Sequence, residues 1–289
     1  MTNLSGLVRL ARPEGEIDVR CLTAGSVTLD NPRAEPGVVP FHLLLDGTCT
    51  LTSGTYSVDL LPGDMALLPH GDAHVVTASD EGIDLFCGHY RFEQGTGALL
   101  FRLMPAVVHV TLDPPALALA EVLRAEAVFD GAGSQAVISA LLDALLVMTL
   151  RSRPDQRLDT PGLWTAMGDD VLGRVITGVL EQPGEPWTID RLASEAAMSR
   201  ATFLRRFSAR TGTTVATLLT AIRMMAAADL LSRTDLPVTR VAGEVGYRSE
   251  SAFSQAFRAA LGTSPARYRR ESRLLAGHGR TTAVTAPVI

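Results

Sequence analysis

The chain has 289 residues, of which 46% are hydrophobic and 20% charged, a composition typical of globular proteins and not of disordered ones. This length suits two domains, each with its own core. The longest apolar stretch, residues 140–150, is too short to span a membrane and contains Asp143, so we expect no membrane partner. We also expect no signal peptide, because no basic segment followed by an apolar run begins the chain. Three cysteines without framework spacing favour the reducing cytoplasm.

Charge is divided unevenly along the chain, although the overall net charge is only −5. Residues 1–165 carry 10 arginines and 20 acidic residues, a net of −10, whereas residues 191–273 carry 14 arginines and 6 acidic residues, a net of +8. The sequence contains no lysine, and planar guanidinium groups suit phosphates and guanine edges. This asymmetry predicts that the basic half binds nucleic acid.

Residues 17–110 are predicted to be rich in β-strands. Short alternating runs are separated by turn-forming residues such as Asp46-Gly47 and Pro62-Gly63. Many short strands at this spacing are typical of an antiparallel sandwich or barrel. The predicted strands are 17–22, 41–45, 49–52, 56–61, 65–68, 74–77 and 83–92.

Helical periodicity begins after Asp113-Pro114-Pro115, where proline suits the first turn of a helix. We predict one helix over 117–129 and a second from Ser134 to about residue 151. The second helix is apolar over much of its circumference, so it must be covered by the barrel, by a second copy of the chain, or by both. A homodimer is therefore the expectation, and a purely intramolecular core is the alternative.

A repeated unit occupies the C-terminal half. The series Ser199, Phe203, Phe207 and Gly212 recurs 50 residues later as Ser249, Phe253, Phe257 and Gly262. Each copy predicts a short helix, a turn and a second helix, which is a helix-turn-helix. We place the two units at about 189–212 and 238–262.

The second helix of each unit is predicted to read DNA, because a helix-turn-helix presents the N-terminal half of that helix to the major groove. Each pair of phenylalanines, spaced four apart, shares the buried face. Arg205 is the best candidate to contact guanine, and Gln255 to contact adenine. The other outward positions are Ala201, Thr202, Leu204, Glu250, Ser251 and Ser254, and the arginines expected at phosphates are Arg200, Arg206, Arg210, Arg248 and Arg258.

This half resembles the AraC/XylS family of transcription regulators over about 100 residues. The most specific part of the resemblance comprises Val241-Ala242, Gly246-Tyr247, Ser264-Pro265 and Tyr268-Arg269. The resemblance implies a regulator, more often an activator than a repressor, with promoter DNA and RNA polymerase as partners. It also implies that a long helix over 215–232 places both reading helices on one face of the DNA.

Two departures from the family pattern affect the first unit. Val215 stands where a proline is common, and Ala201 and Leu204 are apolar at positions that often read bases. The first unit is therefore expected to discriminate mainly through Arg205, Thr202 and methyl contacts.

The acidic half resembles cupins, which are small β-barrels that bind metals or small ligands. The second cupin motif matches Gly63, Pro69, Gly71 and His74, and residues 41–47 resemble the end of the first motif. The His-x-His pair of the first motif is missing, and Ala78 stands where asparagine is expected, so a complete metal ligand set is not implied. With residues 85–92, this half resembles the sensor domain of one AraC branch that includes regulators responding to reactive chlorine species.

Three chemistries are compatible with this sensor half. They are small-ligand binding in the barrel, a thiol switch of Cys21 and Cys87, and a divalent metal such as zinc held by Cys21, His42, His74 and Cys87. His89 lies on the same strand face as Cys87 and is expected to lower the pKa of that thiol. Alternatively, Cys21 and Cys87 have only a structural role as small buried hydrophobic side chains, which is our expectation for Cys49.

We therefore expect an α+β two-domain chain, with an N-terminal cupin-like antiparallel β-barrel carrying two helices and a C-terminal all-α double helix-turn-helix. A cupin-type metalloenzyme is the alternative function, disfavoured by its incomplete ligand set. The expected segments are a sensor and dimerisation domain at 1–152, a linker at 153–168, a DNA-binding domain at 169–273 and a disordered tail at 274–289.

Overall fold

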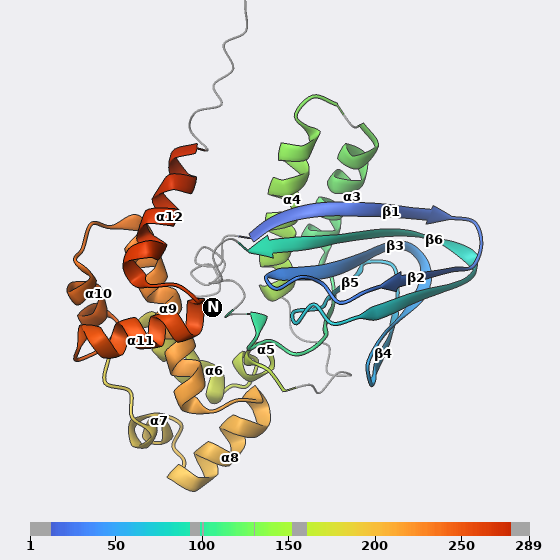
Figure 1. The fold of residues 1–289 in the computed structure, drawn as a ribbon. Helices are drawn as coiled ribbons and strands as arrows, with labels where there is room; N and C mark the ends of the chain where they lie inside the picture. The colour runs from blue at the N-terminus through green and yellow to red at the C-terminus, as the bar shows by residue number, and fades with distance from the viewer. Residues whose placement is uncertain (1–12, 93–98, 100, 130, 152–160, 279–289) are drawn as a thin grey trace, which may run out of the picture.

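The computed structural model describes residues 13–92, 99, 101–129, 131–151 and 161–278, and it shows a sheet half beside a helical half (Figure 1). The sheet is antiparallel throughout, in the order β1-β6-β3-β5-β7, with β2 paired to β6 and β4 paired to β3. Its strands are β1 (Pro13–Thr23), β2 (Val27–Asn31), β3 (Val38–Ser53), β4 (Tyr56–Leu60), β5 (Asp64–Leu67), β6 (His74–Phe92) and β7 (Val108–Thr111).

Strands β3 and β6 each run through two of the predicted strands, so the predicted turn at Asp46-Gly47 is wrong. That dipeptide lies instead at an irregularity in the register between β3 and β6. Gly47 has a φ of 81°, and a Cβ there would lie 2.2 Å from the carbonyl oxygen of Gly82 on β6. A glycine in a bulge and a glycine in a hairpin turn look alike in sequence. The prediction also missed β2 and β7.

Alternate residues of the long strands face two separate cores. Phe41 and Phe86 belong to a core that continues into the helices, whereas Leu44 and Cys87 belong to a second core enclosed by the sheet. The period of two that alternates side chains across a strand produces this division. All three cysteines lie in the second core, and all three are free thiols.

Helices α3 (Pro114–Phe129) and α4 (Ser134–Arg151) pack together beside the sheet (Figure 1). The hydroxyl of Tyr90 donates to the carbonyl of Leu142 at 2.8 Å, and a Cβ at Gly15 would lie 2.5 Å from Leu142 Cβ. Helix α4 therefore lies directly against β1. Four apolar side chains of the two helices remain 42–71% exposed, namely Val122, Val128, Phe129 and Val137.

The helical half contains the two predicted units and more helix than predicted. Its elements are α5 (Leu163–Met167), α6 (Leu172–Glu181), α7 (Ile189–Glu195), α8 (Arg200–Thr211), α9 (Val215–Arg233), α10 (Val238–Glu244), α11 (Glu250–Leu261) and α12 (Pro265–His278). Helix α5 lies within the segment predicted as a linker, and α12 continues past residue 273. Residues 152–160 and 279–289, which complete the predicted linker and tail, are outside the described residues.

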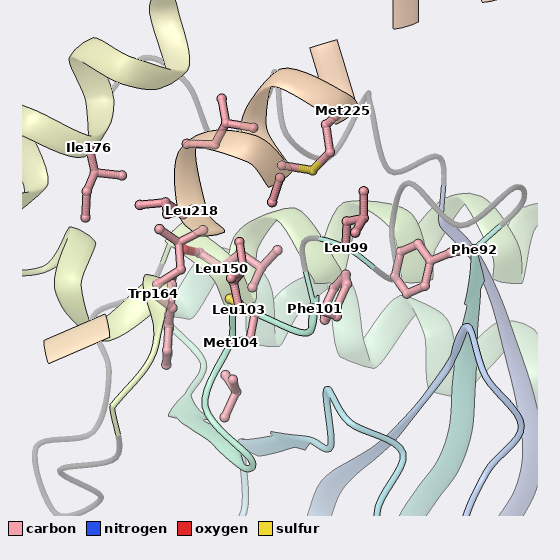
Figure 2. Close-up of a cluster of buried hydrophobic side chains, with 14 of the residues drawn as sticks. Phe92, Leu99, Phe101, Leu103, Met104, Leu150, Trp164, Ile176, Leu218 and Met225 are labelled. Carbon is pink, nitrogen blue, oxygen red and sulfur yellow. The ribbon is translucent and has the colours of Figure 1, made fainter. Parts of the chain in front are cut away.

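A single hydrophobic core joins the two halves (Figure 2). We call the part contributed by both halves the interdomain core; its side chains include Phe101, Leu103, Leu150, Trp164, Leu218 and Met225. Trp164 Nε1 donates to the Leu150 carbonyl at 2.9 Å, and Leu163 N donates to the Leu103 carbonyl at 2.5 Å. Helices α4 and α9 have the length and hydropathy of membrane spans, but both contribute buried side chains to this folded chain.

Candidate nucleic-acid interface and thiol site

The first helix-turn-helix consists of α7 and α8. Ser199 caps α8, because its hydroxyl oxygen accepts from the backbone N–H of Thr202, and Gly212 ends the helix in the left-handed region at φ 67°. Phe203 and Phe207 are buried with ring centroids 5.6 Å apart. The two buried phenylalanines thereby fix the opposite face of α8 toward solvent.

The outward face of α8 carries the predicted reading residues. Ala201, Thr202 and Arg205 are exposed, whereas Leu204 is half-buried against the core. Within the described residues, no hydrogen bond or ion pair engages the Arg205 side chain, so its five N–H donors face solvent. Arg200 is exposed and bonds Asp190 at 2.9 Å.

Two arginines predicted at phosphates, Arg206 and Arg210, lie beside Asp169. Asp169 has no distinguishing pattern in the sequence. Arg206 Nη2 lies 2.7 Å from Asp169 Oδ2, and Arg210 Nε lies 4.0 Å from the same oxygen. Burial opposes ionisation of Asp169, but the hydrogen bond from Arg206 and those from two backbone N–H groups at the start of α6 hold its pKa below the usual value. Arg206 therefore ties α8 to the start of α6, and no local sequence pattern signals this pairing.

The second unit, α10 and α11, repeats this construction. Ser249 caps α11 by accepting from the backbone N–H of Ala252, and Phe253 and Phe257 are fully buried. Their rings also meet Tyr247 and Tyr268, with centroids 5.7 Å and 5.4 Å apart respectively. The predicted contact residues Arg248, Glu250, Ser251, Gln255 and Arg258 are exposed, and Ser254 is half-buried. The Glu250 carboxylate accepts from the Thr239 hydroxyl, so α11 is bonded to α10.

Replacing Arg205 by alanine should weaken specific DNA binding by about 1–3 kcal/mol, because a bidentate contact to guanine would be lost. Fluorescence anisotropy on a duplex selected from random-sequence DNA measures this. Arg200→Ala is the matched control, since loss of a phosphate contact weakens all sequences about equally. An Arg205→Ala protein with wild-type affinity and sequence preference would remove Arg205 from the reading set.

A chain of four groups occupies the second core of the sheet half. Cys87 Sγ lies 3.2 Å from His42 Nδ1, His42 Nε2 lies 2.7 Å from His74 Nε2, and His74 Nδ1 lies 2.9 Å from the carbonyl oxygen of Asp72. His42 on β3 is the register partner of Cys87 on β6. We call this arrangement the thiol–histidine chain.

The proton positions in the thiol–histidine chain follow from its last member. The Asp72 carbonyl can only accept, so His74 Nδ1 donates and His74 Nε2 is left as an acceptor when the ring is neutral. His42 Nε2 then donates to His74, and His42 Nδ1 accepts the S–H of Cys87. His42 is thus placed to receive the proton of the Cys87 thiol.

Burial keeps the side chains of the thiol–histidine chain uncharged. It lowers the pKa of His42 to about 3, with the neighbouring His74 as a lesser cause, and it also lowers the pKa of His74. It raises the pKa of Cys87 to about 12 and that of Cys49 to about 11. Cys87 is therefore a neutral thiol at rest and not a preformed thiolate.

The partner predicted for Cys87 is wrong, since His42 and not His89 contacts its sulfur. His89 Nδ1 bonds the carboxylate of Asp18 at 2.9 Å. The strand-face argument placed Cys87 inward correctly, but the identity of its neighbour depends on the register between β3 and β6, which lie 45 residues apart at this point.

Cys21 lies diagonally across from Cys87. On β1 and β6, Val19 pairs with Cys87 and Cys21 pairs with Leu85, so both thiols face the second core. Diagonal neighbours in antiparallel sheets have Cα atoms about 7–8 Å apart, slightly beyond the roughly 7 Å that a disulfide spans. Bridging requires a small shift of β1, and the register irregularity between Ile17 and Val19 lies in the adjacent segment.

A resident metal ion, which the cupin resemblance suggests, does not fit this arrangement. His42 uses one ring nitrogen toward Cys87 and the other toward His74, so the three side chains do not converge on one point. Within the described residues, no group of three or more histidine, cysteine or acidic side chains is arranged to hold a metal ion.

Comparisons with known proteins agree with both halves. A family profile described as Cupin matches residues 3–153, and one described as Helix-turn-helix domain matches residues 192–271. An uncharacterized HTH-type transcriptional regulator of Haemophilus influenzae is 32% identical over 95% of this chain and 100% of its own length. The RCS-specific HTH-type transcriptional activator RclR of Escherichia coli is 32% identical over 96% of this chain and 100% of its own length.

Several solved structures match part of the chain, among them a DNA-binding domain. The DNA-binding domain of AdpA, crystallised in complex with a target DNA, is 40% identical and covers 38% of this chain and 100% of its own, with a TM-score of 0.37.

Proposed function

The chain belongs to the AraC/XylS family of helix-turn-helix transcription regulators, with a cupin domain ahead of its DNA-binding domain, and from this premise we propose that it is an activator whose cupin domain senses an oxidant. The single observation that carries the proposal is the contact between the Cys87 thiol and the His42 ring, with Cys21 on the neighbouring strand. Its partners would be promoter DNA and RNA polymerase, in the cytoplasm.

The proposed chemistry forms a disulfide in two balanced steps. Hypochlorous acid transfers Cl⁺ to the sulfur of Cys87 while His42 Nδ1 takes the thiol proton, giving the sulfenyl chloride and, after proton return to the departing hydroxide, water. The thiol of Cys21 then attacks this sulfur, which releases chloride and a proton and leaves a Cys21–Cys87 bond. His42 serves as the base, and Cys21 as the resolving thiol.

Because Cys87 is a neutral thiol at rest, a strong electrophile is favoured as its oxidant over a weak one. Peroxide oxidises thiolates, and the pKa of about 12 leaves almost none at neutral pH. A reactive chlorine compound is a stronger electrophile, and RclR, one of the relatives, is named as an RCS-specific activator. A small ligand in the barrel is the second candidate; a metalloenzyme finds no support, because the histidines do not converge.

The disulfide would act on DNA binding through β1. Moving Cys21 toward Cys87 displaces the strand on which Gly15 contacts Leu142 of α4, and near the end of α4 the Leu150 carbonyl accepts from Trp164 in the interdomain core. The result would be a change in the balance between two arrangements of the halves. In support, Gly15 lies directly against Leu142, and Trp164 donates directly to the Leu150 carbonyl.

A homodimer is the proposed assembly. The support for it is that Val122, Val128, Phe129 and Val137 on α3 and α4 leave apolar side chains exposed, which a second copy could cover. Sedimentation velocity of the purified chain distinguishes a dimer from a monomer.

Mass spectrometry under non-reducing conditions tests the chemistry. After stoichiometric hypochlorite, peptides containing Cys21 and Cys87 should be linked, whereas the same dose of hydrogen peroxide should leave them largely reduced. Cys49 is the internal control, because it is buried in the same core but lies outside the thiol–histidine chain. Equal linkage by both oxidants would contradict the preference for a strong electrophile, and linkage through Cys49 would contradict the Cys21–Cys87 pairing.

A further inference from the structure

One side chain contacts both the loop before the first helix-turn-helix unit and the turn of the second. Arg223 lies near the middle of α9, the helix that joins the units. Its Nε donates to the carbonyl of Pro183 at 2.9 Å, and its Nη2 donates to the carbonyl of Glu185 at 3.0 Å. Both acceptors belong to the loop between α6 and α7, so they precede the first unit directly.

The same guanidinium also meets the turn of the second unit. Its carbon lies 5.9 Å from the ring centroid of Tyr247, and a Cβ on Gly246 would lie 2.8 Å from Arg223 Nη2. Gly246 has a φ of 84°, which favours glycine, and the Tyr247 side chain bonds that of Thr220 on α9. The turn between α10 and α11 is thus seated on α9 beside Arg223.

The two segments also touch each other at this point. A Cβ on Gly184 would lie 2.2 Å from the carbonyl oxygen of Glu244, so loop and turn are in backbone contact. Beside this contact the segments are separated by a groove of about 630 Å³, lined by Glu181, Gln182, Pro183, Gly184, Glu185, Thr239, Arg240, Gly243 and Glu244. The loop before the first unit and the end of α10 in the second therefore meet beside Arg223.

The loop that Arg223 bonds is itself rigid. Trp187 Nε1 donates to the Gln182 carbonyl at 2.8 Å, and the Arg191 guanidinium lies over the Trp187 ring at 4.1 Å from its centroid. Thr188 then caps α7. Because the loop is rigid from Gln182 to the start of α7, fixing its carbonyls also fixes the orientation of the first unit.

We propose that Arg223 is a positioning residue that sets the angle between the two helix-turn-helix units and thereby the spacing of the two DNA half-sites that they accept. Half-sites read on one DNA face lie about 10 base pairs apart, and the permitted spacing is a geometric property of the protein. The planar fork of arginine holds two carbonyls in a fixed geometry, whereas an apolar side chain bonds neither. Rotation of the first unit about α9 is opposed by these bonds.

Selection from random-sequence DNA tests the proposal, because the protein itself then chooses the half-sites and their spacing. The wild-type protein should enrich two half-sites at one spacing. Arg223→Met keeps the aliphatic volume and removes both hydrogen bonds, so it should enrich the same half-sites at a wider range of spacings. On the wild-type duplex its affinity should fall about ten-fold, as the loss of hydrogen bonds from a charged group predicts, while affinity for a single half-site stays unchanged.

Two further variants separate positioning from folding. Gly184→Ala should broaden the spacing in the same way, because its Cβ forces the loop from the Glu244 carbonyl without altering Arg223. Arg233→Met, on the same helix and paired with Asp229 at 3.7 Å, should leave the spacing unchanged. A single wild-type spacing for Arg223→Met would overturn the proposal, and so would an equal loss on single and paired half-sites.

Discussion

Replacing Cys87 by serine should reduce the induced activity of a reporter gene to the level seen without oxidant. Serine preserves the size and the hydrogen bond to His42 Nδ1, so the fold and basal DNA binding should persist, but a hydroxyl forms neither a sulfenyl chloride nor a disulfide. Cys21→Ser should give the same loss by a different route, because Cys87 would then be oxidised without a resolving thiol. Reporter assays in cells treated with hypochlorite measure both effects.

Two control variants make this result specific. Cys49→Ser should respond normally, since Cys49 lies in the same core but outside the thiol–histidine chain. His42→Gln should slow oxidation of Cys87 without preventing it at high oxidant, because the base is lost but the thiol is retained. A normal response in Cys21→Ser and Cys87→Ser cells would exclude the thiol switch and favour a small ligand in the barrel.

Mild acid should destabilise the protein through His42. The pKa of His42 is about 3 in the folded state and 6.5 by its usual value. Between these pH values the unfolded chain binds a proton at His42 and the folded chain does not. The stabilisation is complete above about pH 6.5 and declines as the pH falls toward 3. Between about pH 7.5 and about pH 5, His42 alone should lower the free energy of unfolding by about 2 kcal/mol. Urea titrations at several pH values measure this slope.

The His42→Gln variant isolates this contribution from other acidic effects. Glutamine occupies a similar volume and does not titrate, so its free energy of unfolding should depend less on pH in this range. The difference between the two slopes is the relevant quantity, since the substitution also changes stability at neutral pH. Parallel slopes for the wild type and His42→Gln would mean that His42 is charged, or solvated, in the folded protein.

The helical half was largely predictable because its signals are local. Phe203 and Phe207 stand four residues apart behind the capping Ser199, and the same spacing recurs at Ser249, Phe253 and Phe257. A cap and an i, i+4 pair specify a helix and its buried face without reference to distant residues. The structure shows these caps and this burial as expected.

The fold class of the sheet half was predicted, but its side-chain contacts were not, since they depend on the register in which the strands pair. The sequence identified Cys21, His42, His74 and Cys87 as candidates, but only the pairing of β3 with β6 shows which of them touch. A slip of one residue would move His42 to the opposite face of the sheet. The bond of Arg206 to Asp169, and that of Arg223 to the loop before α7, span 37 and 40 residues and carry no local signature.

The interdomain core also limits how such proteins can be recombined. Trp164 bonds a carbonyl of the sensor half, and Leu218 and Met225 of α9 lie in the same core as Leu103. A sensor half borrowed from another regulator would have to supply side chains that fill this same volume, because packed interiors tolerate few voids. A substitution that changes the side-chain volume at Leu103 or Trp164 should therefore require a compensating change on the other side of the boundary.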